Sequence, residues 1–160
     1  MIKARSPQTA IACCLSLTGV VLCGAPSVQA RVTQVVITKT ESPTFGGKTF
    51  DAVGQYERIS GQIIGEVDPR DPVNAIIVDI GLAPKSPNGT VTYSTDFQIL
   101  RPIDRTKGSK RLIYEITNRG RTNVLETLND SKTGNDVESS GDAGNGFLMR
   151  QGYVLSLIHI

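Results

Sequence analysis

The sequence has no tryptophan, a single histidine and no cysteine beyond residue 23. All three cysteines lie near the N-terminus, so the rest of the chain can form neither a disulfide scaffold nor a thiolate metal site. No G-x-S-x-G nucleophile motif occurs, and the only imidazole, His159, is the second-last residue. These absences predict that the chain holds no metal and no cofactor, and that it contains no complete Ser-His-Asp or Cys-His set.

A run of basic residues is also missing. Seventeen Lys and Arg stand against fifteen Asp and Glu, and removing the N-terminal Lys3 and Arg5 leaves fifteen against fifteen. A net charge near zero without a basic stretch argues against nucleic acid as a partner. With 39% hydrophobic and 20% charged residues the balance is globular, and sixteen Gly and eight Pro favour a sheet-rich domain with many turns.

The first thirty residues predict a cleaved export signal. A short positive start precedes an uncharged apolar stretch, residues 9–24, which is short for spanning a bilayer. Val28 and Ala30 are small residues at the two positions that a signal peptidase reads before its cut. We therefore expect cleavage after Ala30, export to the periplasm or the medium, and no membrane association afterwards.

Residues 31–109 are expected to form an antiparallel β-rich opening. Runs of β-branched and alternating apolar residues are separated by turns rich in Pro and Gly. Gly61 and Gly65 inside the second run predict a bulge or a tight bend. Asp68 and Asp71, which flank a proline turn, are interpreted as turn residues and not as an acid–base pair. The predicted strands cover 31–40, 56–68, 74–84 and 90–102, and the last places Val91, Tyr93, Thr95, Phe97 and Ile99 on one face.

The pattern changes at about Lys110. A strand, "RLIYEIT", is followed by a polar loop, a short helix at Phe147–Met149 ended by Gly152, and a second strand from Tyr153. Strand, loop, helix and strand in this order are typical of a parallel α/β unit, so the two strands should be neighbours. The expected fold class is α/β: an antiparallel β-rich part that leads into the first strands and helix of an α/β core.

The most pointed motif is "NRGR", at the carboxyl end of the first of these strands. Asn118 could offer a side-chain amide, Arg119 lies between, and Gly120 would let backbone N–H groups turn toward a pocket. Fixed donors of this kind form an oxyanion hole. The alternative is an ordinary Asn-x-Gly turn that ends the strand.

Residues 129–146 are rich in Asp, Asn, Ser and Gly. They do not fit a calcium loop, because Lys132 and Gly134 stand where oxygen ligands are needed. They also lack the Lys-Ser/Thr of a phosphate-binding loop. We expect a mobile surface loop.

A family resemblance rests on three stretches in order, "FDAVGQYERISGQIIGEVDPRDPVNAIIVDIGLAPKSPNGTVTYSTDFQILRPID", "RLIYEITNRG" and "DAGNGFLMRQGY". They cover most of residues 31–154 and resemble a group of bacterial proteins, often exported, that carry an uncharacterised α/β hydrolase domain. The resemblance implies that residues 110–154 begin an α/β-hydrolase core. It also implies that a serine nucleophile and its partners, located later in a longer chain, attack an ester-like small molecule. Asn118–Gly120 would then serve the oxyanion, although the usual HGGG pattern is missing.

The last six residues, "LSLIHI" (155–160), are suspect as natural sequence. They can be back-translated as CTG TCT CTT ATA CAC ATC, which resembles a transposon-end adapter used in sequencing libraries. We therefore predict that 155–160 is a non-native, adapter-derived tail; the alternative is a genuine apolar strand.

Two functions stay open at this point. The chain is either the N-terminal part of an exported hydrolase, itself lacking the catalytic triad, or a non-enzymatic β-rich periplasmic module that binds a ligand or partner through its sheet.

Overall fold

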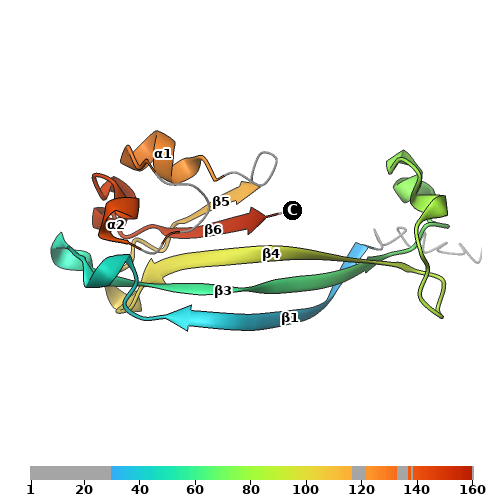
Figure 1. Ribbon diagram of the computed structural model, residues 1–160, viewed down its shortest axis with the longest axis horizontal. Coiled ribbons are helices and arrows are strands. Elements are labelled where there is room, and N and C mark those ends of the chain that lie inside the picture. The colour runs from blue at the N-terminus through green and yellow to red at the C-terminus, as the bar shows by residue number, and fades with distance from the viewer. Residues whose placement is uncertain (1–29, 117–121, 133–136, 138, 160) are drawn as a thin grey trace, which may run out of the picture.

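In the computed structural model, residues 30–116, 122–132, 137 and 139–159 are described, and their strands form a six-stranded mixed sheet (Figure 1). The strand order is β1-β3-β4-β6-β5, and the short β2 pairs with β3. The strands are β1 (Ala30–Glu41), β2 (Thr49–Phe50), β3 (Gly54–Val67), β4 (Val91–Pro102), β5 (Leu112–Ile116) and β6 (Val154–His159).

The helical elements are short. The α-helices within the described ranges are α1 (Val124–Asn129) and α2 (Phe147–Arg150). Single 3₁₀ turns make up the rest: η1 (Phe45–Gly47), η2 (Asp51–Val53), η3 (Pro72–Ile76), η4 (Ile80–Leu82), η5 (Arg105–Lys107) and η6 (Ser140–Ala143).

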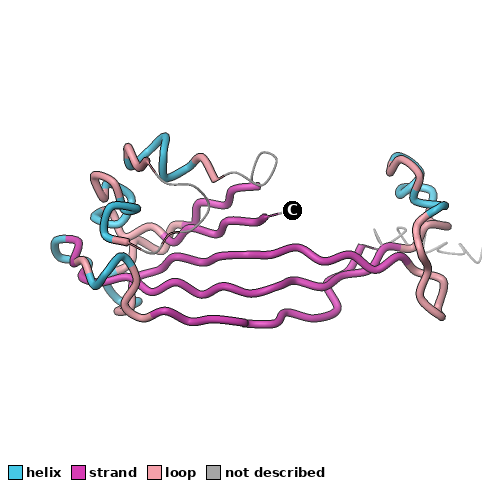
Figure 2. The backbone as a smooth tube through the Cα atoms, in the orientation of Figure 1, coloured by secondary structure: helices cyan, strands magenta, loops and turns pink. Residues whose placement is uncertain are grey.

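The antiparallel opening is confirmed. β1 pairs with β3, and β3 pairs with β4 without interruption from Tyr56 opposite Pro102 to Val67 opposite Val91. The three strands form one long ribbon (Figure 2). The predicted irregularity lies in the neighbouring strand: β1 changes register twice, while Gly61 and Gly65 keep regular partners in β4.

The predicted strand at 74–84 is wrong. Residues 68–90, here called the distal loop, contain η3 and η4 and lie at the end of the ribbon far from α1 and α2 (Figure 1). Asp71 caps η3 by accepting the backbone N–H of Val73 at 3.0 Å, and Asp79 takes a left-handed φ of 58°. A capped turn that begins with proline favours helical over extended backbone, so the apolar alternation of this stretch does not become a strand.

The predicted neighbours "RLIYEIT" and "YVL" are confirmed. β5 and β6 pair in parallel, with Leu112 opposite Val154 and Ile116 opposite Ile158. β6 also pairs antiparallel with β4, so it is an interior strand. The short helix is confirmed as α2, and the chain leaves it through Gly152 at φ 68°. The adapter origin of residues 155–160 stays a prediction.

The expected α/β-hydrolase core is wrong. The fold is mostly β, a six-stranded mixed sheet with one parallel pair, and its two α-helices have six and four residues. The physical reason lies between α1 and α2, where Gly144 and Gly146 take left-handed φ values of 53° and 74°. Backbone of that kind interrupts helices, and Asp130 at φ 52° ends α1, so the helices among the described residues stay short.

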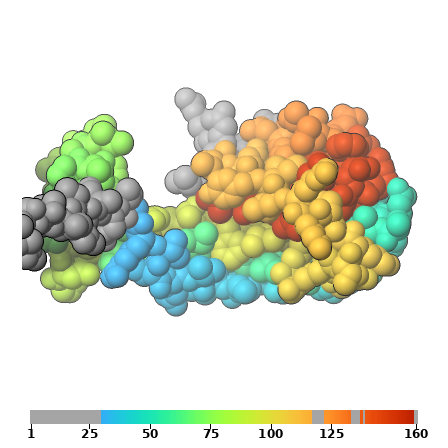
Figure 3. All heavy atoms as spheres, turned by 180° about the vertical axis from the view of Figure 1, so that it is seen from behind, coloured from blue at the N-terminus to red at the C-terminus, as the bar shows by residue number. Residues whose placement is uncertain are grey.

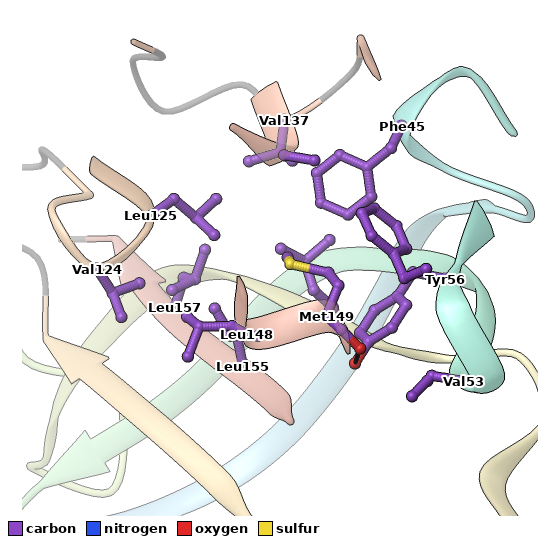
Figure 4. Packing of buried hydrophobic residues seen from close by; sticks show 13 residues of the cluster. Phe45, Val53, Tyr56, Val124, Leu125, Val137, Leu148, Met149, Leu155 and Leu157 are labelled. Carbon is purple, nitrogen blue, oxygen red and sulfur yellow. Dashed lines mark hydrogen bonds between the residues drawn. The ribbon is translucent and has the colours of Figure 1, made fainter. Parts of the chain in front are cut away.

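The main hydrophobic core lies at one end of one face of the sheet, beneath α1 and α2 (Figure 4). Phe50 stands edge-on between Phe45 and Tyr56, with ring centroids 5.6 Å apart in both pairs. The cluster consists of Phe45, Phe50, Val53, Tyr56, Leu100, Val124, Leu125, Val137, Ala143, Leu148, Met149, Leu155 and Leu157.

Candidate binding surface

The predicted oxyanion residues Asn118, Arg119 and Gly120 lie outside the described residues. The structure does show how the segments on either side are fixed. The carboxylate of Glu115, near the end of β5, accepts the backbone N–H of Asn123 at 2.8 Å and of Val124 at 3.2 Å. These bonds satisfy donors that the start of α1 leaves free, so Glu115 has a structural role.

Ala30, the predicted last residue of the export signal, is the first residue of β1 and pairs with Val67. Cleavage after it would leave the rest of β1 in the sheet. The cleavage itself stays a prediction.

Asp68 and Asp71 are confirmed as turn residues. Asp68 accepts both the side chain and the backbone N–H of Arg70, each at 2.9 Å. The side-chain hydrogen bond from Arg70, followed by the backbone bond, lowers the pKa of Asp68 to about 2. A carboxyl group held ionised in this way is a poor proton donor or acceptor near neutral pH.

Sequence reasoning missed a buried amide at the end of α1. The side chain of Asn129 donates to the carbonyl oxygen of Ala143 at 3.1 Å and accepts the N–H of Leu148 at 2.9 Å. It ties α1 to the segment that leads into α2, so the prediction of a mobile surface loop is wrong at this point. The sequence offered one weak indication of this contact. The pair Asn129 and Asp130 is typical of a helix that ends in a left-handed residue, and Asp130 takes that conformation here.

Tyr56 is a buried phenol without a catalytic neighbour in the described structure. Its hydroxyl reaches the carbonyl oxygens of Tyr153 at 2.9 Å and Met149 at 3.2 Å. Burial raises the pKa of Tyr56 well above its ordinary value. The phenol therefore stays protonated and fastens β3 to the turn between α2 and β6.

The two faces of the sheet can be distinguished by register. Side chains alternate between faces along each strand, and paired residues share a face. Tyr56, Leu100 and Leu155 contact the main core, so this side is the helix-side face. The opposite side is here called the uncovered face. Every buried apolar residue of α1 and α2 belongs to the helix-side core.

The helix-side face is apolar only where helices cover it. Farther along the ribbon, toward the distal loop, it becomes mainly polar, with Val36 and Ile64 as its apolar members, and some of its polar side chains bond one another. Gln62 donates to Asp96 at 3.2 Å, and Thr90 donates to Glu66 at 3.0 Å. The other residues of this bare stretch include Ser60, Gln98, Ser94, Thr92, Gln34 and Arg31. Residue polarity here follows exposure to water, as it does in most half-exposed sheets.

The uncovered face departs from that rule, because it is mostly apolar along the sheet; its polar members on the strands are Thr40, Thr95, Ser156 and the pair Glu57 and Arg101. At its centre Ile59, Phe97 and Ile158 form a second cluster, with Ile63 and Ile99 packed against it. Only strand residues contribute to this cluster. The two edge strands extend it with Val32, Val35 and Ile37 of β1 and Leu112, Tyr114 and Ile116 of β5.

The rim of the uncovered face is exposed. The six edge-strand side chains are between 57% and 64% exposed, whereas the central cluster is at most 9% exposed. β1 runs along the surface in the view from behind (Figure 3). The charged pair on the strands of this face, Glu57 and Arg101, is joined at 2.6 Å and lies at one end. Large contiguous apolar areas on the surface of soluble proteins are often interaction sites.

Two glycines on the uncovered face lie beneath aromatic rings. A side chain at Gly61 would meet the ring of Phe97 at 2.8 Å, and one at Gly65 would meet the ring of Tyr93 at 2.4 Å. Both aromatic rings therefore lie over glycine backbone, where they occupy the space that side chains would fill. The sequence alone had shown these glycines only as points of irregularity.

The described residues contain no group of three or more His, Cys, Asp or Glu side chains that could hold a metal ion. In the same part of the chain, no helix has the length and apolarity needed to cross a membrane. No protein-family model matches this chain, and no curated protein and no solved structure was found to be similar to it.

Proposed function

We propose that this chain is a non-enzymatic β-rich binding module that acts after export and engages an apolar partner surface through the uncovered face. The observation that carries the proposal is a contrast between two parts of the same sheet that no helix covers. The part of the helix-side face that no helix covers is mainly polar, whereas the uncovered face is mostly apolar. A face that worked in water would carry the polar pattern of the first.

The proposal can be tested with an apolar fluorescent dye and a matched pair of variants. Val35 and Gln34 are neighbours in β1 whose side chains point to opposite faces. The chain should bind the dye when dilute. Val35→Lys should weaken that binding at least about fivefold, and Gln34→Lys should leave it unchanged. Absence of dye binding by a folded chain, or equal loss in both variants, would contradict the proposal.

Export belongs to the proposal and has its own test. N-terminal sequencing of the chain from the periplasm of an expressing bacterium should begin at Arg31. A soluble cytoplasmic chain that retained Met1 would contradict it.

A second candidate function is that the chain is the N-terminal part of an exported enzyme that hydrolyses ester-like small molecules. It is supported by the family resemblance and by the parallel pair of β5 and β6, because the segment Asn118–Gly120 follows the carboxyl end of β5 in sequence. This proposal concerns the activity and does not need the α/β-hydrolase core that the fold contradicts.

The gene of origin decides between the two functions. If its reading frame extends beyond residue 160 and encodes G-x-S-x-G followed by an acidic residue and a histidine, hydrolysis is favoured. The 160-residue chain itself should not turn over an aryl ester. Turnover that survived His159→Ala would show that the chain contains chemistry which neither proposal assigns to it.

A further inference from the structure

We propose that the partner of the uncovered face is a second copy of this chain, so that two sheets stack face to face around a two-fold axis. This inference rests on the proposed function and names the partner that the face fits.

The uncovered face offers enough area for a specific dimer. The six edge-strand side chains are between 57% and 64% exposed, and Tyr93 is 38% exposed. Taking on the order of 100 Å² for an exposed aliphatic side chain and about 200 Å² for tyrosine, these residues with the central cluster offer roughly 600 Å². Two copies would bury roughly 1,200 Å², the lower end of the range for specific interfaces.

The charges of the uncovered face are also compatible with a second copy. A surface that meets its own copy places like charges close together unless it is neutral or its charges are already paired. On the strands of this face, Glu57 and Arg101 neutralise each other at 2.6 Å. β1 carries two exposed basic side chains, and both lie on the helix-side face: Arg31 and Lys39. Two copies can therefore approach without electrostatic repulsion from the apposed strands.

The shape of the sheet suits a second copy as well. Two sheets pack well face to face when their twists have the same hand and similar magnitude, and identical sheets meet this condition automatically. The rings of Phe97 and Tyr93 lie over Gly61 and Gly65, between the rows of exposed apolar side chains on β1 and β5. Side chains of a second sheet can interdigitate with such rows at the usual spacing of about 10 Å.

The test measures mass and dye binding across concentration. The protein is the full chain, expressed with its own N-terminal segment and purified in the form that the host produces. Sedimentation velocity should show a dimer that dissociates on dilution, and dye binding should rise as the dimer dissociates. Val35→Lys should raise the dissociation constant at least about tenfold, and Gln34→Lys should change it less than about twofold.

Cross-linking provides a second measurement in case lysine at position 35 disturbs folding. The native cysteines all precede residue 24, so in processed chain an introduced cysteine is the only thiol. A bis-maleimide with a flexible spacer long enough to reach across the stacked faces should join two copies of Val35→Cys more readily than two copies of Gln34→Cys.

The outcomes separate this inference from the function on which it rests. A chain that stays monomeric up to about 100 µM, yet binds dye equally at all concentrations, would overturn the second copy. The proposed function would then stand with another apolar protein or a lipid surface as occupant. A dimer that both variants weaken equally, or that neither weakens, would also overturn the inference. Loss of dye binding in the dilute monomer would overturn the proposed function itself.

Discussion

The two faces of this sheet are built from the same strands, yet the match between side-chain polarity and exposure to water differs between them. On the helix-side face Leu100 and Leu155 are fully buried beneath α1 and α2, and the strands become polar beyond the helices. On the uncovered face the apolar pattern runs through all five long strands, and the side chains of β1 and β5 are more than half exposed. Under the proposed function, the polarity along each strand reflects what covers that strand in the working protein.

The largest expected effect is in the main core. Leu100→Ala should lower the free energy of unfolding by about 2–5 kcal/mol, because it opens a cavity where leucine is fully buried. Ile37→Ala on the uncovered face should cost about 0.5 kcal/mol or less in the monomer, since that side chain is already 61% exposed. Urea unfolding followed by circular dichroism compares them. Equal losses would show that the uncovered face is packed in the free chain.

The glycine beneath Phe97 should come next. Gly61→Ala should cost about 1–3 kcal/mol, because the new methyl group would overlap the carbonyl oxygen of Val36 and the Phe97 ring. Gly81→Ala in the distal loop is the matched control, since nothing lies within 4 Å of a side chain there. Thermal unfolding of both variants measures the difference. A neutral Gly61→Ala would mean that the ring does not lie over this glycine.

A buried hydroxyl should have a smaller effect. Tyr56→Phe should cost about 1–2 kcal/mol, because it leaves buried carbonyl oxygens of the helical layer without their donor. Tyr114→Phe, at an exposed position of the uncovered face, should change little. Chemical unfolding at neutral pH gives both values, and equal effects would contradict the assignment of Tyr56 to the core.

The same phenol predicts a pH dependence with a definite sign. Its pKa is raised in the folded chain, so the stability that it contributes is complete below the unfolded pKa of about 10 and declines as pH rises above it. Tyr56→Phe should therefore show a shallower loss of stability than the unchanged chain between about pH 10 and 12. Parallel curves for the two proteins would contradict this.

The smallest expected effect is at the rim of the uncovered face. Val32→Thr replaces an aliphatic side chain that is 57% exposed by a polar one of similar shape, so the monomer should keep its stability within about 0.5 kcal/mol. Dye binding should nevertheless weaken. Ser94→Thr, a similar small change on the bare helix-side face, should alter neither quantity.

Strand pattern and turn chemistry were sufficient to predict β1, β3, β4, the parallel pairing of β5 with the strand that begins near Tyr153, and the helix before Gly152. Residues 155–160, most of which belong to β6, were instead expected to be a non-native tail. Strand pattern and turn chemistry failed at Ile76, Val78 and Leu82, which are more than 80% exposed, because alternation carries no information about whether a partner strand exists. They also failed for the hydrolase core. A run of polar residues and glycines between two strands specifies a crossover, but it does not specify how much helix the crossover will contain.

The candidate surface was only partly readable from sequence. The single face formed by Val91, Tyr93, Thr95, Phe97 and Ile99 was predicted, and it is the β4 part of the uncovered face. That Leu112, Tyr114 and Ile116 continue the same face depends on β6 lying between β4 and β5. Such long-range order is fixed by tertiary packing, and the local pattern of each strand leaves it undetermined.

The distal loop is a position at which the chain can be cut without separating the paired strands. Residues 68–90 join β3 to β4 at the far end of the ribbon, and the side chains of Ile76 and Val78 are among the most exposed in the described structure. Exposed loop tips of this kind are preferred sites of proteolytic nicking. A nick there would separate the chain into two polypeptides, but the uninterrupted pairing from Tyr56–Pro102 to Val67–Val91 would still hold them together. Two separately produced pieces that end and begin in this loop should therefore reassemble, which makes the position a natural place to split the protein into complementing halves.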